Sequence, residues 1–138
     1  MNRMKFAIDI HGVIDQRPKF FRRMCKSMVQ GNVEVHILTG KHIENGIKEE
    51  LLELGFLFDI HYTHLFSISD YHKEQGTIMW GDVKNPHMDD SDWDRTKADY
   101  CLREHIDFCI DDKEPYMEYF LTPVSLYKGN TAKPSRID

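Results

Sequence analysis

The sequence predicts an α/β protein in which helices cover both faces of a central, mostly parallel sheet, as a three-layer, Rossmann-like sandwich. Short apolar runs rich in β-branched residues alternate along the chain with segments whose apolar residues recur every three or four positions. Strands separated by helices pair in parallel through right-handed crossovers. The 138 residues suffice for one domain with its own core, and no repeat or low-complexity linker divides them. We therefore expect a single domain over residues 1–138.

The first part of the chain alternates two predicted strands with two predicted helices. Residues 5–10 and 33–38 are short apolar runs of the kind found in strands buried on both faces. Between them, apolar residues at helical spacing predict a helix that begins at Pro18 and stops at Gly31. Apolar residues spaced four, four and three positions apart predict a second helix before Gly55: Ile43, Ile47, Leu51 and Leu54.

The second part of the chain is less regular. Residues 58–66 predict a third strand, although Tyr and His are mixed with Ile and Leu there. Residues 67–92 are expected to form an irregular insert near the active site, because they hold two glycines, an Asn-Pro pair and several acids. A helix is expected from about Asp92, with one face formed by Ala98, Cys101, Leu102 and His105. Residues 106–110 and 124–127 predict two further strands.

Composition excludes several classes of protein. The formal net charge of −5 argues against general nucleic-acid or membrane binding, because both require a basic face. Three cysteines without paired spacing are expected to be buried thiols in a reducing compartment: Cys25, Cys101 and Cys109. The first apolar run is short and interrupted by Asp9, so it predicts neither a secretory signal nor a membrane span. We therefore expect a cytoplasmic protein.

Polar residues follow several predicted strands at the point where each strand ends. Asp9 ends the first strand, Thr39 and Gly40 follow the second, and Asp111 and Asp112 follow a later one. Ligands of open parallel sheets bind outside the carboxyl ends of the strands. We therefore expect these residues to converge at one edge of the sheet, together with Lys97 from the preceding helix.

Two carboxylate sites, a hydroxyl and an amine at one edge predict phosphate chemistry. Carboxylates hold Mg²⁺, a hard cation that prefers oxygen ligands. The cation and Lys97 would neutralise a phosphoryl group, so that an anionic nucleophile could approach it. Thr39 and the backbone N–H groups that follow it would bind phosphate oxygens ahead of a helix. Asp9 could then attack phosphorus and form an aspartyl-phosphate.

Four segments of the chain resemble the motifs of the haloacid dehalogenase superfamily. Residues 9–15, Asp-Ile-His-Gly-Val-Ile-Asp, resemble the first motif, usually Asp-x-Asp-Gly-x-x-x-Asp. Residues 35–40 are similar to the second motif, an apolar strand that ends in Thr or Ser. Lys97 resembles the third motif and residues 108–112 the fourth. The resemblance implies the fold of that family, with a small cap or none, and Mg²⁺-dependent hydrolysis of a phosphate monoester.

The resemblance also implies a role for each matched position. Asp9 would be the nucleophile, and the catalytic set would be Asp9, His11, Thr39 and Lys97. The metal would be held by Asp9, the backbone carbonyl of His11, Asp111 and Asp112. The phosphoryl group would be held by Thr39, Gly40 and Lys97. As an alternative, Asp111 and Asp112 could cap the short helix that follows them, and Lys97 could be a solvated helix residue.

His11 departs from the family pattern, because most phosphatases of the family have Asp at this position. That Asp protonates the leaving oxygen and then activates water, and a histidine can perform both steps near neutral pH. The substitution leaves two alternatives open: a Mg²⁺- or phosphate-binding module without efficient turnover, and a phosphotransferase with an acceptor other than water. The expected partner is a phosphorylated small molecule, and the negative charge disfavours a nucleic-acid end.

Other polar groups have simpler interpretations. The acids at 89–94 are expected to cap a helix rather than to bind a metal. His61 and His64 would lie on opposite faces of the predicted strand and so share no metal. Because residues 67–92 are too few for a large cap, we expect an open active site that is shaded at most by the loop of Trp80, Asn85 and His87.

Overall fold

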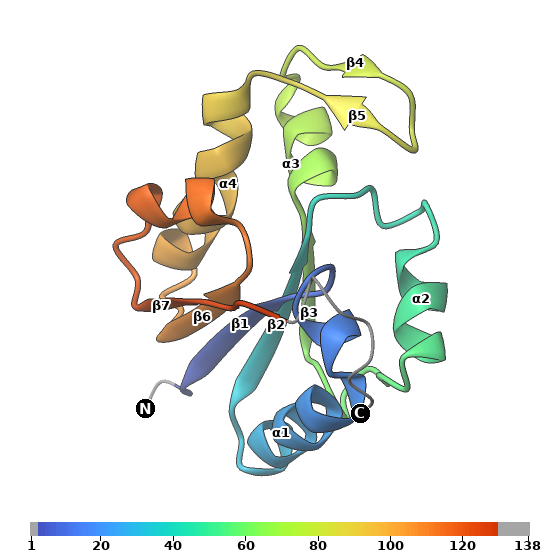
Figure 1. The fold of residues 1–138 in the computed structure, drawn as a ribbon, viewed down its shortest axis with the longest axis vertical. Coiled ribbons are helices and arrows are strands. Elements are labelled where there is room, and N and C mark those ends of the chain that lie inside the picture. The colour runs from blue at the N-terminus through green and yellow to red at the C-terminus, as the bar shows by residue number, and fades with distance from the viewer. Residues whose placement is uncertain (1–2, 130–138) are drawn as a thin grey trace.

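The computed structural model describes residues 3–129 and places a five-stranded parallel sheet at the centre of the molecule (Figure 1). The strand order is β3-β2-β1-β6-β7, so β1 lies in the middle and β3 and β7 form the edges. This confirms the predicted α/β class with a parallel sheet. The strands are β1 (Lys5–Asp9), β2 (Glu34–Thr39), β3 (His64–Ser67), β6 (Phe108–Asp111) and β7 (Val124–Leu126).

Helices cover both faces of the sheet. Buried residues of α1 and α2 pack in one core with β1 and β2, and buried residues of α4 pack in a second core against the other face. Helix α3 lies beside α4 (Figure 1). The helices are α1 (Pro18–Gln30), α2 (Ile47–Glu53), α3 (Ile68–Gln75) and α4 (Asp90–Arg103), with short 3-10 helices η1 (Ile14–Gln16) and η2 (Glu114–Tyr119).

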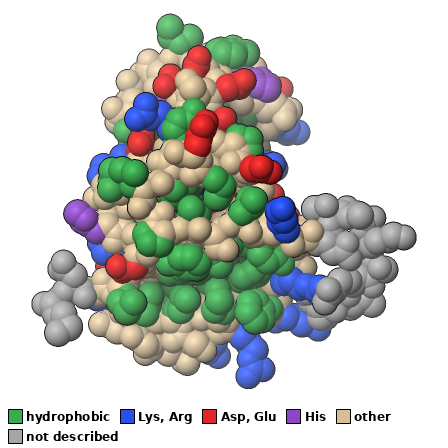
Figure 2. Space-filling model, turned by 60° about the vertical axis from the view of Figure 1, so that its left-hand side comes forward, with side chains coloured by type: hydrophobic (Ala, Val, Ile, Leu, Met, Phe, Trp, Pro, Cys, Tyr) green, Lys and Arg blue, Asp and Glu red, His purple; other side chains and the backbone are tan. Residues whose placement is uncertain are grey.

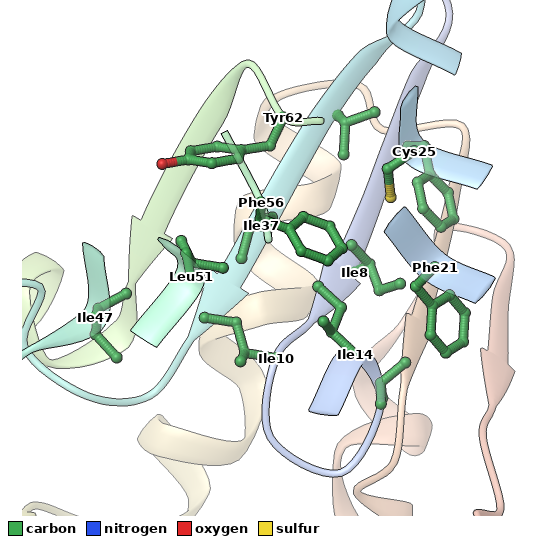
Figure 3. Packing of buried hydrophobic residues seen from close by; sticks show 13 residues of the cluster. Ile8, Ile10, Ile14, Phe21, Cys25, Ile37, Ile47, Leu51, Phe56 and Tyr62 are labelled. Atoms are coloured by element: carbon green, nitrogen blue, oxygen red, sulfur yellow. The ribbon is translucent and has the colours of Figure 1, made fainter. Parts of the chain in front are cut away.

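The alternation of side chains along β1 produces the two cores. Phe6 and Ile8 point toward α1 and α2, and Figure 3 shows Ile8 packed with Ile37 of β2 and Phe21 of α1. Ala7 belongs to the other core, beneath α4. Because successive strand residues point to opposite faces, Asp9 follows Ala7 and faces α4. The alternation of side chains along β1 therefore determines that the Asp9 carboxylate faces α4.

Three predicted elements differ from the structure. The strand predicted over 58–66 is shorter, since β3 begins at His64 and a turn with Asp59 at a φ of 67° precedes it. Helix α2 begins only at Ile47, after Gly46 in the left-handed conformation. The predicted apolar face of α4 is wrong in part, because Leu102 is 53% exposed and His105 lies after the helix.

Residues 67–92 are not irregular throughout, which corrects the prediction for this segment. They contain α3 and a hairpin of β4 (Trp80–Gly81) and β5 (Pro86–His87). Ser67 caps α3 by accepting the backbone N–H of Asp70. The helix escapes prediction because only its first two residues are buried, so it has no apolar stripe.

The three cysteines lie in the core, and apolar side chains gather on one face of the surface. Cys25, Cys101 and Cys109 are buried free thiols, as predicted. Apolar side chains form a broad band across the face shown in Figure 2, with most of the acidic side chains above it. None of the helices formed by residues 3–129 combines the length and the apolar character needed to cross a bilayer.

Candidate functional site

Two carboxylates and one amine meet at the carboxyl end of the sheet. Asp9 is the last residue of β1, and Asp111 is the last residue of β6, which pairs with β1. Lys97 of α4 lies between them: its Nζ donates to Asp9 Oδ1 at 2.9 Å and to Asp111 Oδ2 at 2.8 Å. Only 2% of Lys97 and 4% of Asp9 is exposed. The structure therefore brings these three predicted residues together, and Lys97 is not a solvated helix residue.

The periodicities of strand and helix explain this meeting. Ala7 of β1 and Cys109 of β6 pack in the core beneath α4, where they meet Cys101. Two residues further along each strand, Asp9 and Asp111 lie on that same face of the sheet. Lys97 precedes Cys101 by four residues, so it lies one turn earlier on the same side of the helix. The apolar packing of α4 thus directs the amine to both carboxylates.

Burial and charge act in opposite directions on these groups. Burial raises the pKa of Asp9 to about 8, although the Lys97 charge opposes this shift. Burial by itself would lower the pKa of Lys97, but the charges of Asp9 and Asp111 outweigh it and raise this pKa above its ordinary value. Lys97 is therefore held in its charged form, whereas Asp9 favours its protonated form when no further cation is present.

Asp112 adds a third carboxylate and creates a site that fits a divalent cation. One oxygen from each of Asp9, Asp111 and Asp112 lies within 4.8 Å of the others. Among residues 3–129, no donor forms a hydrogen bond with the buried Oδ1 of Asp112, and burying an unpaired carboxylate oxygen is costly. With all three carboxylates ionised, as a bound cation would require, they and the Lys97 ammonium give a charge of −3 + 1 = −2. A divalent cation balances this charge with the oxygen ligands it prefers.

A tight turn after β1 leaves room for Asp112. Gly12 has a φ of +89°, and a Cβ at this position would overlap the carboxylate of Asp112. The backbone N–H of Gly12 donates to Asp15 Oδ1 at 2.8 Å, which holds the turn. A side chain at position 12 would therefore be excluded both by its backbone conformation and by the lack of space.

His11 lines the site beside Asp9, and its ring approaches α2. Its Nε2 lies 2.7 Å from Glu50 Oε2, and each side chain is about one-third exposed, at 34% and 32%. Within the described part of the chain, no group forms an aligned hydrogen bond with this nitrogen. Glu50 therefore lies next to the ring without being ideally oriented toward it. The His11 side chain is outside the three-carboxylate cluster.

The residues after β2 are only partly as predicted. Thr39 is fully buried, and its Oγ1 accepts the backbone N–H of Lys41 at 3.3 Å. Gly40 and Lys41 line the cavity in front of Asp9, whereas Thr39 is not one of its lining residues. Of the predicted phosphate-binding residues, the structure thus places Gly40 and Lys97 on the cavity wall and does not place Thr39 there.

The cavity has a volume of about 330 Å³ and an aromatic wall. Trp93 of α4 donates its indole N–H to the hydroxyl of Tyr116 at 2.9 Å. A Cβ on Gly40 would lie 2.7 Å from the Trp93 ring, so the glycine allows this ring to pack against the strand end. The Lys97 ammonium lies 5.6 Å from the centre of the Tyr116 ring. Tyr116 therefore lies beside the buried amine, and Trp93 holds the Tyr116 hydroxyl in place.

The hairpin of β4 and β5 shades the cavity, in agreement with the expected position of this loop. Asn85, Pro86 and His87 line the cavity. Trp80 stacks on His87 with ring centres 6.5 Å apart and lines a neighbouring pocket instead. Of the acids at 89–94, Asp89 caps α4 as predicted by accepting two backbone N–H groups, whereas Asp90, Asp92 and Asp94 lie within the helix.

A second group of ionisable residues lies at the opposite end of the sheet. His36 Nε2 lies 2.8 Å from Glu34 Oε1, and its Nδ1 lies 2.6 Å from the Tyr100 hydroxyl. Burial lowers the pKa of His36. The rings of His36 and His64 stack in parallel at 4.1 Å, whereas two rings that share a metal would each point an edge toward it. We interpret this group as a hydrogen-bonded cluster.

The prediction for His61 and His64 was wrong in its structural premise. His61 lies in the turn before β3 rather than in a strand, and its Nδ1 accepts the backbone N–H of Leu57 at 3.0 Å. His61 and His64 therefore have different partners, and the alternation of side chains along a strand does not apply to His61.

Glu50, Trp93 and Tyr116 were not identified from the sequence. An acid on the polar side of a helix has the pattern of a solvated residue, so nothing local marks Glu50. The contact between Trp93 and Tyr116 joins α4 to η2, and these two elements meet only once the whole sheet has formed.

Comparisons with protein-family models, with curated proteins and with solved structures give no significant match for this chain.

Proposed function

We propose that this chain is a Mg²⁺-dependent phosphohydrolase of the haloacid dehalogenase superfamily, which cleaves a phosphate monoester through an aspartyl-phosphate on Asp9. One observation carries the proposal: Lys97 bridges Asp9 and Asp111 in a buried contact, beside the third carboxylate of Asp112. A nucleophile, a fixed amine and a site suited to a divalent cation are the parts that phosphoryl transfer needs. The four motifs supply these parts in the order of that family.

In the proposed reaction, an oxygen of Asp9 attacks phosphorus while the bond to the leaving oxygen breaks. The leaving oxygen takes a proton from His11, and Asp9 carries the phosphoryl group. A water molecule then loses a proton to His11 and attacks phosphorus, which releases inorganic phosphate and restores the Asp9 carboxylate. Lys97 holds a phosphoryl oxygen throughout. Mg²⁺, held by the three carboxylates, would offset the charge of the phosphoryl group.

The contact between His11 and Glu50 supports the proton-transfer role. A carboxylate 2.7 Å from Nε2 can fix the rotation of the ring, as carboxylates beside catalytic histidines do. Glu50 comes from the first turn of α2, which is anchored by its buried residues Ile47 and Leu51. The residue that would orient the His11 ring, Glu50, is therefore not one of the carboxylates that would hold the cation.

An assay with p-nitrophenyl phosphate tests the proposal. The purified chain should hydrolyse it only with Mg²⁺, and Asp9→Asn should abolish turnover. Asp99→Asn is the matched control, because Asp99 is an exposed residue of α4 that pairs with Arg95, away from the site. Metal-independent turnover that survives Asp9→Asn would overturn the proposal.

The histidine at position 11 also favours a second candidate, a Mg²⁺- or phosphate-binding module or phosphotransferase of the same fold. If wild type is inert toward the aryl phosphate and His11→Asp gains turnover, this second function replaces the first. We place either function in the cytoplasm, because the three cysteines are free, buried thiols, as expected in a reducing compartment.

A further inference from the structure

The cavity in front of Asp9 is positively charged although the chain as a whole is acidic. Four lysines and one aspartate line it, and the sum stays positive, +4 − 3 = +1 with neutral histidines, when Asp111 and Asp112 beside Asp9 are counted as well. The whole chain carries −5. Like charges gathered around one cavity in an acidic protein repel one another, and an anionic ligand relieves that repulsion. The lining is Lys41, Lys84, Lys97, Lys113 and Asp9, with uncharged and histidine neighbours.

Only one of these lysines is used by the buried cluster. Lys97 is held by Asp9 and Asp111. The side chains of Lys41, Lys84 and Lys113 are exposed, and over residues 3–129 none of their ammonium groups forms a hydrogen bond or an ion pair. Three positive charges at the cavity therefore remain available to a ligand.

The backbones of the three lysines are fixed even though their ammonium groups are free. The N–H of Lys41 donates to Thr39 Oγ1 at 3.3 Å. The N–H of Lys84 donates to Asp82 Oδ1, and that of Lys113 donates to Asp111 Oδ1, each at 3.0 Å. These residues lie on three separate segments: after β2, in the β4–β5 turn and after β6. The fold thus brings three anchored cations from distant parts of the chain to one opening.

We propose that the three lysines form a second anion subsite, and that the substrate is a small molecule whose leaving group carries a further phosphate. This inference rests on the proposed function. With Mg²⁺ and Lys97 at the phosphoryl group that is transferred, a neutral leaving group would leave the three ammonium charges unmatched. A second phosphate would meet them by charge-assisted hydrogen bonds. A sugar bisphosphate and a nucleoside bisphosphate share this chemistry.

The volume and the aromatic wall fit the organic part of such a molecule. A cavity of about 330 Å³ is at the small end of the range for small-molecule sites. The Trp93 ring is held in place by the Tyr116 hydroxyl and by its packing on Gly40. A fixed aromatic ring offers an apolar face to a sugar or a base at little entropic cost. The three lysines would then hold the distal phosphate beyond this wall.

The experiment compares kcat/KM for paired substrates with Mg²⁺: fructose 1,6-bisphosphate with fructose 6-phosphate, and adenosine 3′,5′-bisphosphate with adenosine 5′-phosphate. We expect wild type to prefer at least one bisphosphate over its partner. Lys84→Met should reduce that preference about tenfold, the effect of one lost charge-assisted contact. Lys48→Met is the matched control, since Lys48 is an exposed residue of α2 outside the cavity, and should keep the preference.

Four results would overturn the inference or separate it from the proposed function. Equal kcat/KM within both pairs, or a preference that Lys84→Met leaves intact, removes the second anion subsite. A 5′-phosphorylated oligonucleotide that is cleaved faster than every small bisphosphate replaces the small-molecule class. If no ester is hydrolysed, calorimetric titration of Asp9→Asn with adenosine 3′,5′-bisphosphate still tests the subsite: binding weakened by Lys84→Met supports it, and no binding refutes it.

Discussion

Removing the amine of Lys97 probes the buried charge cluster directly. Lys97→Met keeps an unbranched side chain but leaves Asp9 and Asp111 without the donor that each contacts within 3 Å, at 2.9 and 2.8 Å. Removing one partner of a buried ion pair costs about 3–5 kcal/mol. The pKa of Asp9 is already about 8 in the intact cluster, so Asp9 is largely protonated at neutral pH without a cation, and the variant leaves less uncompensated charge behind. We therefore expect the free energy of unfolding to fall by about 3 kcal/mol, the lower end of that range.

Urea unfolding followed by circular dichroism at neutral pH, without divalent cations, measures this change. Lys48→Met, on the exposed side of α2, is the control and should alter stability by no more than about 0.5 kcal/mol. If Lys97→Met does not fold, Asp111→Asn provides the second test, since it keeps the contact between Lys97 and Asp9. A loss below about 1 kcal/mol for Lys97→Met would refute the argument, because such a value belongs to an exposed ion pair.

Three further changes test other parts of the structure. Gly12→Ala should weaken Mg²⁺ binding at least tenfold in calorimetric titration, because its Cβ would displace Asp112; unchanged affinity would contradict the packing of the turn. Glu50→Gln should lower kcat more than KM for p-nitrophenyl phosphate, since it acts through His11; an effect on KM alone would argue against a positioning role. His36 should cost stability as the pH drops from about 6.5 toward 5, because burial lowers its pKa, so the folded state binds its proton more weakly than the unfolded state. Asp9, whose pKa burial raises, acts in the opposite direction over this range. The measurement is therefore the difference between the urea midpoints of wild type and His36→Gln, which should shift against wild type as the pH falls.

The features of the fold that depend on local periodicity could be predicted from the sequence. The apolar runs before Asp9 and Asp111 form neighbouring parallel strands, and their shared parity brings both carboxylates to the face of α4. Lys97 could be assigned because it lies near the start of the helix that precedes Asp111 and because its order among the motifs indicated the site. Elements whose main contacts are polar could not be predicted in this way, and α3 is the clearest example.

The features that depend on tertiary contacts could not be predicted from the sequence. Glu50 meets His11 only because α2 packs on the sheet beside the turn after β1, and no spacing in the sequence encodes that distance. The same holds for Lys41 and Lys84, exposed loop residues that line one cavity only because the hairpin lies over the strand ends. Thr39 shows the reverse case: a residue type and position that match a motif do not determine where the hydroxyl is directed.

The central claim is that Asp9 is the nucleophile, and trapping its phosphorylated form tests that claim most directly. Reduction with borohydride during turnover of p-nitrophenyl phosphate converts an aspartyl-phosphate into homoserine, which peptide mass spectrometry can locate. We predict homoserine at position 9, only when both Mg²⁺ and the ester are present. Turnover accompanied by homoserine at another carboxylate, such as Asp111, or by none at Asp9, would contradict the account.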